Sequence, residues 1–231
     1  CLLRNERNLG WAGAVNRALG QARGDFVLLL NNDAFLLPHT VERLLVCFQL
    51  HPRTGLVAPF TNVAVRAQRY LPALLSHTDG TYFRKRLQHV LGPKGSLLKT
   101  FGAYRSRQEL SHFYRRFFLP RKPRFPSVPC VIGFCVLGRL RMFREVGPLD
   151  ERFRYCGFED FDYCVRIRLA GRSIRTAEHA YVHHEGSRAF TRHSRLLGGV
   201  LEENKQRFIE KWRRVPEARK MAEEMIRCYE S

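Results

Sequence analysis

Residues 26–33 read Phe-Val-Leu-Leu-Leu-Asn-Asn-Asp, an unbroken apolar run that ends abruptly in three polar residues. An apolar run of this length is typical of a strand that is buried on both faces of a sheet. A helical pattern that ends at Gly24 precedes the run, and a second helical pattern follows Pro38. Helices that alternate with buried strands indicate an α/β fold whose sheet is mixed and mostly parallel. Ligands bind such sheets at the carboxyl ends of the strands, where residues 31–33 lie.

The remaining elements follow the same alternation, outside a segment at residues 66–126. We expect further strands at residues 56–58, 131–137 and 174–182. A short helical turn is expected to end at Val146. Longer helices are expected from Phe158 to just before Gly171, at residues 196–214, and from Pro216 onward.

Three carboxylates, those of Glu159, Asp160 and Asp162, fall within four positions at the start of one predicted helix. Carboxylates in a first helical turn lie at the positive end of the helix dipole, which favours their ionised form. Such carboxylates suit a general base or a metal ligand. An equally simple interpretation is that they cap the helix and pair with Arg166 and Arg168.

Composition limits the class of protein. The chain has 231 residues, of which 45% are hydrophobic and 12% aromatic, and this excludes wholesale disorder. It is long enough for one sizeable core with an inserted or terminal subdomain. No apolar run approaches the length of a membrane-spanning helix. The seven cysteines form no CxxC pair, so we expect neither a zinc knuckle nor a disulfide framework, and a reduced cytoplasmic compartment fits best.

The chain is strongly basic, with 40 Lys and Arg against 21 Asp and Glu, a net charge of +19. Residues 66–126 hold fourteen of these basic residues but only Asp79 and Glu109, which leaves +12 in that segment. Such charge attracts nucleic acid, anionic lipid or nucleotide diphosphates. The segment, with helices expected at residues 82–91 and 108–119, is interpreted as a lid, an acceptor-binding insertion or a membrane-surface patch. A solvated basic connector is the simplest alternative.

Three polar clusters follow buried strands or begin a helix: residues 31–33, the pair Glu159 and Asp160 together with Asp162, and the pair His183 and His184. In an α/β sheet these positions converge on one cleft. A carboxylate and an imidazole there could hold Mg²⁺ or Mn²⁺ together with a pyrophosphate, and a separate carboxylate would be free to take a proton. Each cluster alone is a weak signal, because a strand-end Asp is usually a turn residue and paired histidines are often a surface feature.

The ordered series of motifs resembles family 2 glycosyltransferases of the GT-A fold, and it covers nearly all of the chain outside residues 66–126. The series is most similar to the bacterial branch that acts on rhamnose-containing or other surface polysaccharides. The matching segments are residues 8–10 (Asn-Leu-Gly), 13–16 (Gly-Ala-Val-Asn), 26–33, 133–135 (Gly-Phe-Cys), 146–153 (Val-Gly-Pro-Leu-Asp-Glu-Arg-Phe), 157–163 (Gly-Phe-Glu-Asp-Phe-Asp-Tyr) and 183–187 (His-His-Glu-Gly-Ser).

The resemblance implies an inverting transfer of a sugar from a nucleotide-diphosphate donor to an acceptor hydroxyl. Asn31, Asn32 and Asp33 stand where the family has its DXD metal motif, so Asp33 would bind a divalent metal, Mg²⁺ or Mn²⁺, that bridges the diphosphate. Asn31 replaces the first acid of that motif and lowers the ligand charge. Asp160 matches the catalytic base of the family, with Glu159 beside it.

The resemblance also assigns residues to the two substrates and the metal. His183 matches a histidine that completes the metal shell in several members, and His184 is the adjacent alternative. Donor-side and acceptor-side residues follow from the other matching segments. They are Asn8, Gly10 and Asn16 with residues 31–33 on the donor side, and Gly133, Phe134 and Asp162 on the acceptor side.

The predicted organisation has four parts. Residues 1–65 form the donor-binding part of the GT-A domain, residues 66–126 the basic insertion, residues 127–195 the acceptor and catalytic part, and residues 196–231 the C-terminal helices. Members of the family open with a strand and a helix before the segment that matches residues 8–10. We therefore expect that the sequence is truncated at its amino terminus.

Two other classes of function compete with the transferase. The basic segment could belong to a nucleic-acid-binding module, although the chain shows no recognisable nucleic-acid-binding motif and its carboxylate clusters would repel phosphate. The chain could also be a glycosyltransferase-like scaffold that binds without catalysis. The expected partners are a nucleotide sugar and a glycan or lipid-linked acceptor. Peripheral contact with the anionic inner face of the cytoplasmic membrane is a further hypothesis.

Overall fold

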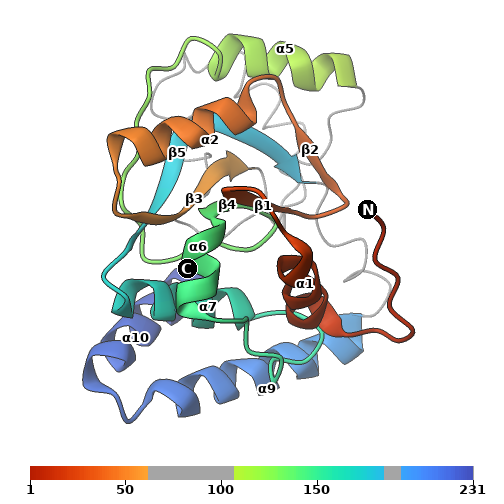
Figure 1. Ribbon diagram of the computed structural model, residues 1–231, viewed down its shortest axis with the longest axis vertical. Coiled ribbons are helices and arrows are strands. Elements are labelled where there is room, and N and C mark those ends of the chain that lie inside the picture. Colours follow the sequence, from red (N-terminus) through yellow and green to blue (C-terminus); the bar gives the residue numbers. More distant parts are fainter. Residues whose placement is uncertain (62–106, 185–193, 231) are drawn as a thin grey trace, which may run out of the picture.

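The computed structural model describes residues 1–61, 107–184 and 194–230. Its centre is a five-stranded sheet of order β1-β4-β3-β5-β2, with helices on both faces (Figure 1). The strands are β1 (Phe26–Leu30), β2 (Ala34–Leu36), β3 (Thr54–Thr61), β4 (Cys135–Arg139) and β5 (Ser173–His184). The helices are α1 (Gly10–Gln21), α2 (Thr40–Leu50), α5 (Arg107–Phe117), α6 (Leu140–Val146), α7 (Glu159–Leu169), α9 (Ser194–Trp212) and α10 (Pro216–Glu230).

The α/β class and the order of the predicted elements are confirmed. The strand expected at residues 131–137 is wrong by several residues, because β4 begins only at Cys135. Val131 is 1% exposed, so the apolar residues before β4 are buried as part of an irregular segment rather than a strand. The short strand β2 was not predicted, since Ala34–Leu36 is too short to show an alternating pattern.

The sheet is mixed, as predicted, but its neighbouring strands are mostly antiparallel. Among the described strands, only β3 and β5 pair in parallel, whereas β1 with β4, β3 with β4, and β2 with β5 pair antiparallel. The prediction of a mostly parallel sheet is therefore corrected: β1, β3 and β5 share one direction, but β4 runs the opposite way between β1 and β3. The shared direction still brings the carboxyl ends of β1, β3 and β5 to one edge.

Alternate residues of β3 pack against different helical layers. Leu56 and Ala58 belong to a cluster with residues of α7, α9 and α10. Val57 belongs to a separate cluster with Leu44 and Phe48 of α2. This alternation follows the period of two in a strand and explains why β3 is buried along its whole length. Figure 1 shows α2 and α5 on one side of the sheet, and α1, α6 and α7 on the other, with α9 and α10 outermost.

The second half of the predicted basic insertion is part of the folded domain. Helix α5 places Leu110, Phe113 and Tyr114 in a buried cluster with Tyr181 of β5. Arg43 of α2 donates hydrogen bonds to carbonyl oxygens that follow α5, at 2.8 Å and 2.9 Å. The interpretation of residues 107–126 as a solvated connector is therefore wrong, because their aromatic side chains fill the core. The helix expected at residues 82–91 lies outside the described residues.

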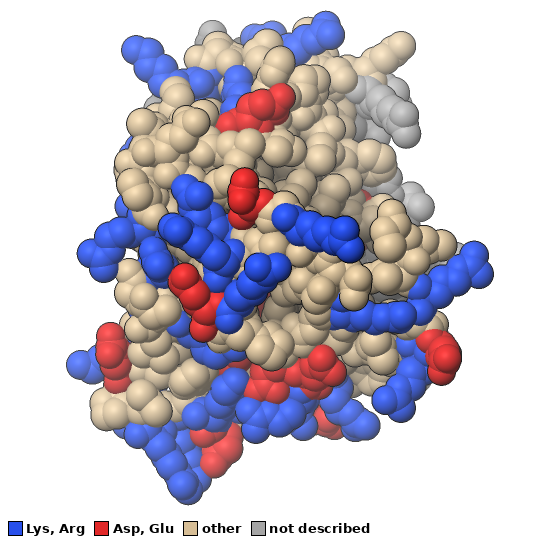
Figure 2. Space-filling view, in the orientation of Figure 1, with Lys and Arg blue, Asp and Glu red and all other residues tan. Residues whose placement is uncertain are grey.

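Basic charge is spread over the described surface as well. Figure 2 shows Lys and Arg side chains gathered over α6 and beside it, and basic and acidic side chains mixed along α9 and α10. All seven cysteines are free thiols in this structure. No helix in the described ranges is both long enough and apolar enough to cross a membrane.

Candidate active site

The carboxyl end of β5 brings His184 against Asp33. The His184 Nε2 atom lies 3.1 Å from Asp33 Oδ1. The contact follows from the register of the sheet, because β2 begins directly after Asp33 and places Ala34 opposite His184. The His184 side chain is 11% exposed and that of Asp33 is 24% exposed. Two residues that were predicted to bind a metal are therefore in contact at the expected edge of the sheet.

His183 lies on the other face of the strand, since successive residues of a strand point to opposite sides. It is 4% exposed, and its ring centroid is 6.4 Å from that of Phe35. The ring of His184 instead stacks on Phe134, with centroids 5.0 Å apart. The resemblance named His183 first as a metal ligand, but the geometry favours its neighbour His184. The alternation of side chains along β5 puts the two histidines on opposite faces. Only the register between β5 and β2 shows which of them meets Asp33.

Gly133 and Phe134 connect the two predicted clusters. The Gly133 backbone N–H donates to Asp160 Oδ2 at 3.2 Å. The Phe134 carbonyl oxygen accepts a hydrogen bond from the backbone N–H of Asn31 at 2.8 Å. Because the ring of Phe134 also stacks on His184, two consecutive residues contact both the acidic helix and the pair of Asp33 and His184. The strand-end and helix-start clusters are thus linked through Gly133 and Phe134.

Asp160 is the second residue of α7, and its carboxylate accepts two backbone N–H groups. One comes from Gly133, and the other comes from Phe161 at 2.8 Å. Burial raises the pKa of Asp160 above the usual 3.8, while these hydrogen bonds act in the opposite direction. A partly buried carboxylate with a raised pKa is a stronger base than an ordinary aspartate and suits proton abstraction.

Glu159 is more deeply buried than Asp160, with 4% of its surface exposed. Its Oε2 atom has no hydrogen-bond partner among the described residues. Burial raises the pKa of Glu159, and the negative charge of Asp160 raises it further. The pKa values of both carboxyl groups are therefore raised, and the pair takes up a proton at higher pH than two ordinary carboxyl groups would.

We expect Glu159→Gln to stabilise the protein at high pH. The folded state binds the proton of Glu159 more tightly than the unfolded state does. The free energy of unfolding of the unmodified protein should therefore fall as pH rises from about 4.5 through the raised pKa. The variant escapes this loss, so it should be more stable by about 1–3 kcal/mol on the alkaline side and nearly equal at pH 4.5. Urea unfolding at both pH values measures the difference.

Glu223→Gln is the matched control, because Glu223 pairs with Arg219 on the surface and its side chain is 55% exposed. Because that variant keeps Glu159, its stability should fall with rising pH as that of the unmodified protein does, and the difference between the two should not depend on pH. Equal stability of the unmodified protein and Glu159→Gln across the whole range would contradict the raised pKa of Glu159.

The turn before α7 has an unusual backbone. Tyr155 and Phe158 have positive φ angles of 58° and 72°, which residues other than glycine rarely adopt. Phe158 is 3% exposed, and its ring lies 5.5 Å from that of Phe161 and 5.7 Å from that of Phe208 in α9. Packing against α9 therefore maintains the turn that aims Glu159 and Asp160.

Helix α1 begins against the same turn. Gly10 has a φ of 71°, and a Cβ atom there would come within 3.1 Å of the Tyr155 backbone nitrogen. The Trp11 backbone N–H donates to the Tyr155 carbonyl oxygen at 2.7 Å. The Trp11 ring also covers Gly133 so closely that a Cβ atom at Gly133 would lie 2.4 Å from the ring. Sequence reasoning missed Trp11 as a site residue, because its helical spacing indicated only a core position.

Three of the predicted donor-side residues, Asn8, Gly10 and Asn16, lie in α1 or just before it, next to the loop that precedes α7. Asn8 is exposed, and its Oδ1 atom accepts the Gly10 N–H at 2.9 Å. The Asn16 side chain exchanges two hydrogen bonds with the backbone of Leu149, at 2.9 Å and 2.8 Å, and donates to Glu151 Oε1 at 2.9 Å. Asn16 thus ties α1 to the loop before α7. Contact of these residues with a donor stays a prediction.

Asp162 does not face the site. It is 0% exposed and lies 2.6 Å from Lys211 Nζ and 3.1 Å from Arg166 Nε. The indole N–H of Trp212 donates to the same carboxylate at 3.1 Å. The acceptor-side prediction for Asp162 is not supported by this position, because its carboxylate is enclosed by α7 and α9. For this one acid, the simpler interpretation of a structural ion pair with Arg166 was right.

Asp33 and His184 offer one oxygen and one nitrogen, which are suitable ligands for Mg²⁺ or Mn²⁺. Residues 1–61, 107–184 and 194–230 contain no group of three or more His, Cys, Asp or Glu side chains that could hold a metal ion. With Asn31 in place of a second acid, an ion at this pair needs ligands from elsewhere, and a diphosphate can provide them. The donor set therefore fits a metal that binds together with a diphosphate.

Comparison with known proteins places these features in a family. The model of the family described as Glycosyl transferase family 2 matches residues 1–147, which is more than half of the chain.

Two curated relatives cover most of the chain. An N-acetylglucosaminyl-diphospho-decaprenol L-rhamnosyltransferase from two strains of Mycobacterium tuberculosis is 28% identical over 196 residues. That match covers 80% of this chain and 58% of the relative, so the chain spans little more than half the length of the relative. An uncharacterized protein of Sinorhizobium fredii is 26% identical over 190 residues, which cover 80% of this chain and 18% of that protein.

A solved structure supports the fold. The crystal structure of GalNAc-T7 with UDP, GalNAc and Mn²⁺ matches with a TM-score of 0.50 and 15% sequence identity. The match covers 80% of this chain and 31% of the other. At this level of identity, the likeness concerns the fold alone.

Proposed function

Because the chain belongs to glycosyl transferase family 2, we propose that it transfers a sugar from a nucleotide-diphosphate donor to an acceptor hydroxyl, with inversion of the anomeric centre. The GT-A fold and the grouping of the predicted site residues at one edge of the sheet support this function. The protein would act in the assembly of a bacterial cell-wall or surface glycan.

One observation carries the proposal: Gly133 and Phe134 join a general base to a donor-side pair. Gly133 donates to Asp160, and Phe134 stacks on His184, which contacts Asp33. A group-transfer enzyme needs a base beside the acceptor and a stabilised leaving group beside the donor, both held by rigid elements. A structural ion pair would not need to be built beside a second polar cluster in this way.

Asp160 would act on the acceptor. As the acceptor hydroxyl attacks the anomeric carbon, Asp160 takes the hydroxyl proton, and the bond from the anomeric carbon to the diphosphate breaks. The nucleotide leaves with the bonding electron pair, and a single displacement inverts the centre. The Gly133 N–H keeps the carboxylate oriented, and Glu159 stays protonated, so that the site does not gather two negative charges.

Asp33 and His184 would serve the leaving group. They are the described residues that fit a divalent metal, which when bound would stabilise the negative charge that develops on the diphosphate. Phe134 keeps the His184 ring in its orientation by stacking against it. The backbone N–H of Asn31 is already used by the Phe134 carbonyl oxygen, so its side-chain amide is the part that remains for the donor.

The curated relative gives the substrate classes to test first. Its name specifies an L-rhamnosyl group and a lipid-linked diphosphate sugar as acceptor. We propose the same classes here: a nucleotide-activated deoxyhexose as donor, and an acceptor sugar on an isoprenoid diphosphate at the membrane surface. A basic surface, part of which Figure 2 shows, would favour binding near anionic lipid.

A panel of UDP-, dTDP- and GDP-sugars tests the proposed function on the protein expressed from its complete gene. With Mg²⁺ or Mn²⁺, one donor should raise Tm, and nucleotide should be released when acceptor is added. Stabilisation by a donor without turnover on any acceptor would instead indicate a binding scaffold. If no donor changes Tm, the proposal fails.

The Asp33→Asn variant tests the donor-side pair. The variant should need at least about tenfold more metal than the unmodified protein for the donor to raise Tm equally, because a charged ligand becomes neutral. The matched control is Asp25→Asn, the same change at an exposed position before the opposite end of β1. Equal metal dependence in the two variants would rule out Asp33 as the ligand.

A further inference from the structure

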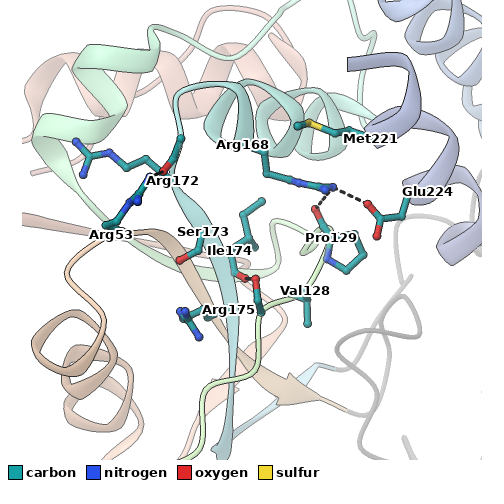
Figure 3. Close-up of a pocket in the computed structure, with 12 residues that line it drawn as sticks. Arg53, Val128, Pro129, Arg168, Arg172, Ser173, Ile174, Arg175, Met221 and Glu224 are labelled. Carbon is teal, nitrogen blue, oxygen red and sulfur yellow. Dashed lines mark hydrogen bonds and ion pairs between the residues drawn. The ribbon is translucent and has the colours of Figure 1, made fainter. Parts of the chain in front are cut away.

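A cavity of about 500 Å³ lies at the opposite end of the sheet from the candidate active site (Figure 3). Arg53 directly precedes β3, and Ser173 is the first residue of β5, so the cavity is at the amino ends of these two parallel strands. Helix α7 contributes Arg168, and α10 contributes Glu224. Ser173 and His184 are the first and last of the twelve residues of β5, and a fully extended strand of that length spans at most roughly 36 Å.

The cavity has an excess of positive charge. Four arginines and one glutamate line it: Arg53, Arg168, Arg172, Arg175 and Glu224. Figure 3 shows the Arg168 guanidinium turned toward Glu224, whereas the guanidinium groups of Arg172 and Arg175 point away from that pair. The net positive charge of these residues would attract an anion to the cavity.

The single glutamate neutralises only one of the four. Arg168 Nη1 lies 2.8 Å from Glu224 Oε2, as the dashed line in Figure 3 marks. Arg172 reaches Glu145 at 3.5 Å, but both side chains are substantially exposed. Such an exposed pair is easily opened by a competing anion.

Arg53 and Arg175 have no carboxylate partner in the part of the chain that the structure describes. Arg53 donates to the Gly171 carbonyl oxygen at 3.1 Å, and Arg175 donates to the Phe125 carbonyl oxygen at 2.6 Å. These bonds fix the side chains without neutralising them. Because Arg175 lies near Cys47 and His51, Arg53 is the cation that is pre-organised at the cavity.

Two residues of the cavity lining also carry unused hydrogen-bond donors. The Ser173 hydroxyl and the Arg175 Nε atom are buried and have no hydrogen-bond partner among the described residues. A buried donor without a partner costs about 1–3 kcal/mol, so these groups would gain from a ligand that carries acceptor oxygens. Charge and hydrogen bonding therefore indicate the same kind of ligand.

We propose that this cavity binds a phosphate or diphosphate group of a small molecule. Arginine is the side chain best matched to phosphate oxygens, because its planar fork donates two parallel hydrogen bonds. The volume of about 500 Å³ falls within the usual range for small-molecule sites and is too small for a polynucleotide. The group could belong to a soluble phosphoester or to the headgroup of an anionic lipid.

Titration with inorganic pyrophosphate tests the soluble source. The titration uses the protein from the complete gene, by calorimetry in chloride buffer with EDTA, which removes any metal-dependent binding at the active site. The double variant Arg53→Gln with Arg172→Gln should bind at least about tenfold more weakly, because two charge-assisted contacts are lost. The control, Arg23→Gln with Arg213→Gln, makes the same change in charge at exposed positions that do not line the cavity and should bind normally.

Sedimentation with vesicles tests the lipid source. Phosphatidylglycerol vesicles, but not phosphatidylcholine vesicles, should bind the protein, and the Arg53→Gln with Arg172→Gln variant should reduce that binding more than the control does. If the double variant fails to fold, Ser173→Ala replaces it as the test, because it removes one hydroxyl group from a residue of the cavity lining. This variant should weaken pyrophosphate or vesicle binding about threefold or more. If neither probe distinguishes the cavity variants from the control, the proposal is overturned.

Discussion

Replacing Asp160 with asparagine is expected to lower the rate of sugar transfer by about 10²–10⁴-fold, the usual contribution of a general base. Asparagine has nearly the same shape, and its amide oxygen can still accept one of the two backbone N–H groups, that of Gly133 or that of Phe161, so the side chain should keep its place. The amide cannot take a proton from the acceptor hydroxyl. Donor-induced stabilisation should therefore persist in the variant while nucleotide release nearly stops.

Single-turnover assays with a saturating donor separate the loss of chemistry from a loss of binding. Asp25→Asn, the same substitution at an exposed position, should retain full activity. Because burial raises the pKa of Asp160, the transfer rate of the unmodified protein should fall on acidification at a pH above the usual 3.8 of aspartate. An Asp160→Asn variant within tenfold of normal activity would show that another group takes the proton.

The second large effect concerns folding stability. Asp162→Ala should reduce the free energy of unfolding by about 3–5 kcal/mol, the usual effect of removing one member of a buried ion pair. The substitution leaves Arg166 and Lys211 without their shared carboxylate, and it removes the acceptor of the Trp212 indole N–H. Chemical denaturation followed by Trp fluorescence measures the change.

A surface ion pair provides the comparison. Glu210 pairs with Arg213 at 2.7 Å, but its side chain is 60% exposed, so Glu210→Gln should cost less than about 1 kcal/mol. A similarly small loss for Asp162→Ala would mean that the buried cluster does not hold α7 to α9. Asp162→Ala should also lower activity at temperatures where it remains folded, since α7 carries the base.

Local patterns in the sequence predicted most of the fold. The run from Phe26 to Leu30 is a strand with those bounds, because nothing polar interrupts it and polar residues follow it at once. Helix α1 ends shortly before Gly24, and helix α2 begins two residues after Pro38, as the positions of these two residues predicted. Strand directions were harder, since an apolar run does not show which way it crosses the sheet, and β4 proved to be antiparallel to both of its neighbours.

The sequence predicted which residues belong to the candidate site, but not how these residues contact one another. The sequence indicated Asp33, Asp160 and the histidine pair, because each lies at a strand end or a helix start. It did not indicate that His184 rather than His183 meets Asp33, because that depends on the register of a three-residue strand. The sequence also did not show that the acids of α7 differ in their surroundings. In the structure Asp160 is partly exposed, whereas Asp162 is fully buried.

The links that hold the site together join residues far apart in the sequence, and this has a consequence for biosynthesis. Asn16 and Leu149 are 133 positions apart, and Asp162 and Trp212 are 50 positions apart. Such contacts form late, because closing a long loop costs entropy before the contact returns any stability. While α9 is still inside the ribosome, the buried carboxylate of Asp162 lacks Lys211 and Trp212. We therefore expect a nascent chain to acquire its catalytic geometry only after α9 has emerged, so that partly synthesised protein in the cell consumes no donor sugar.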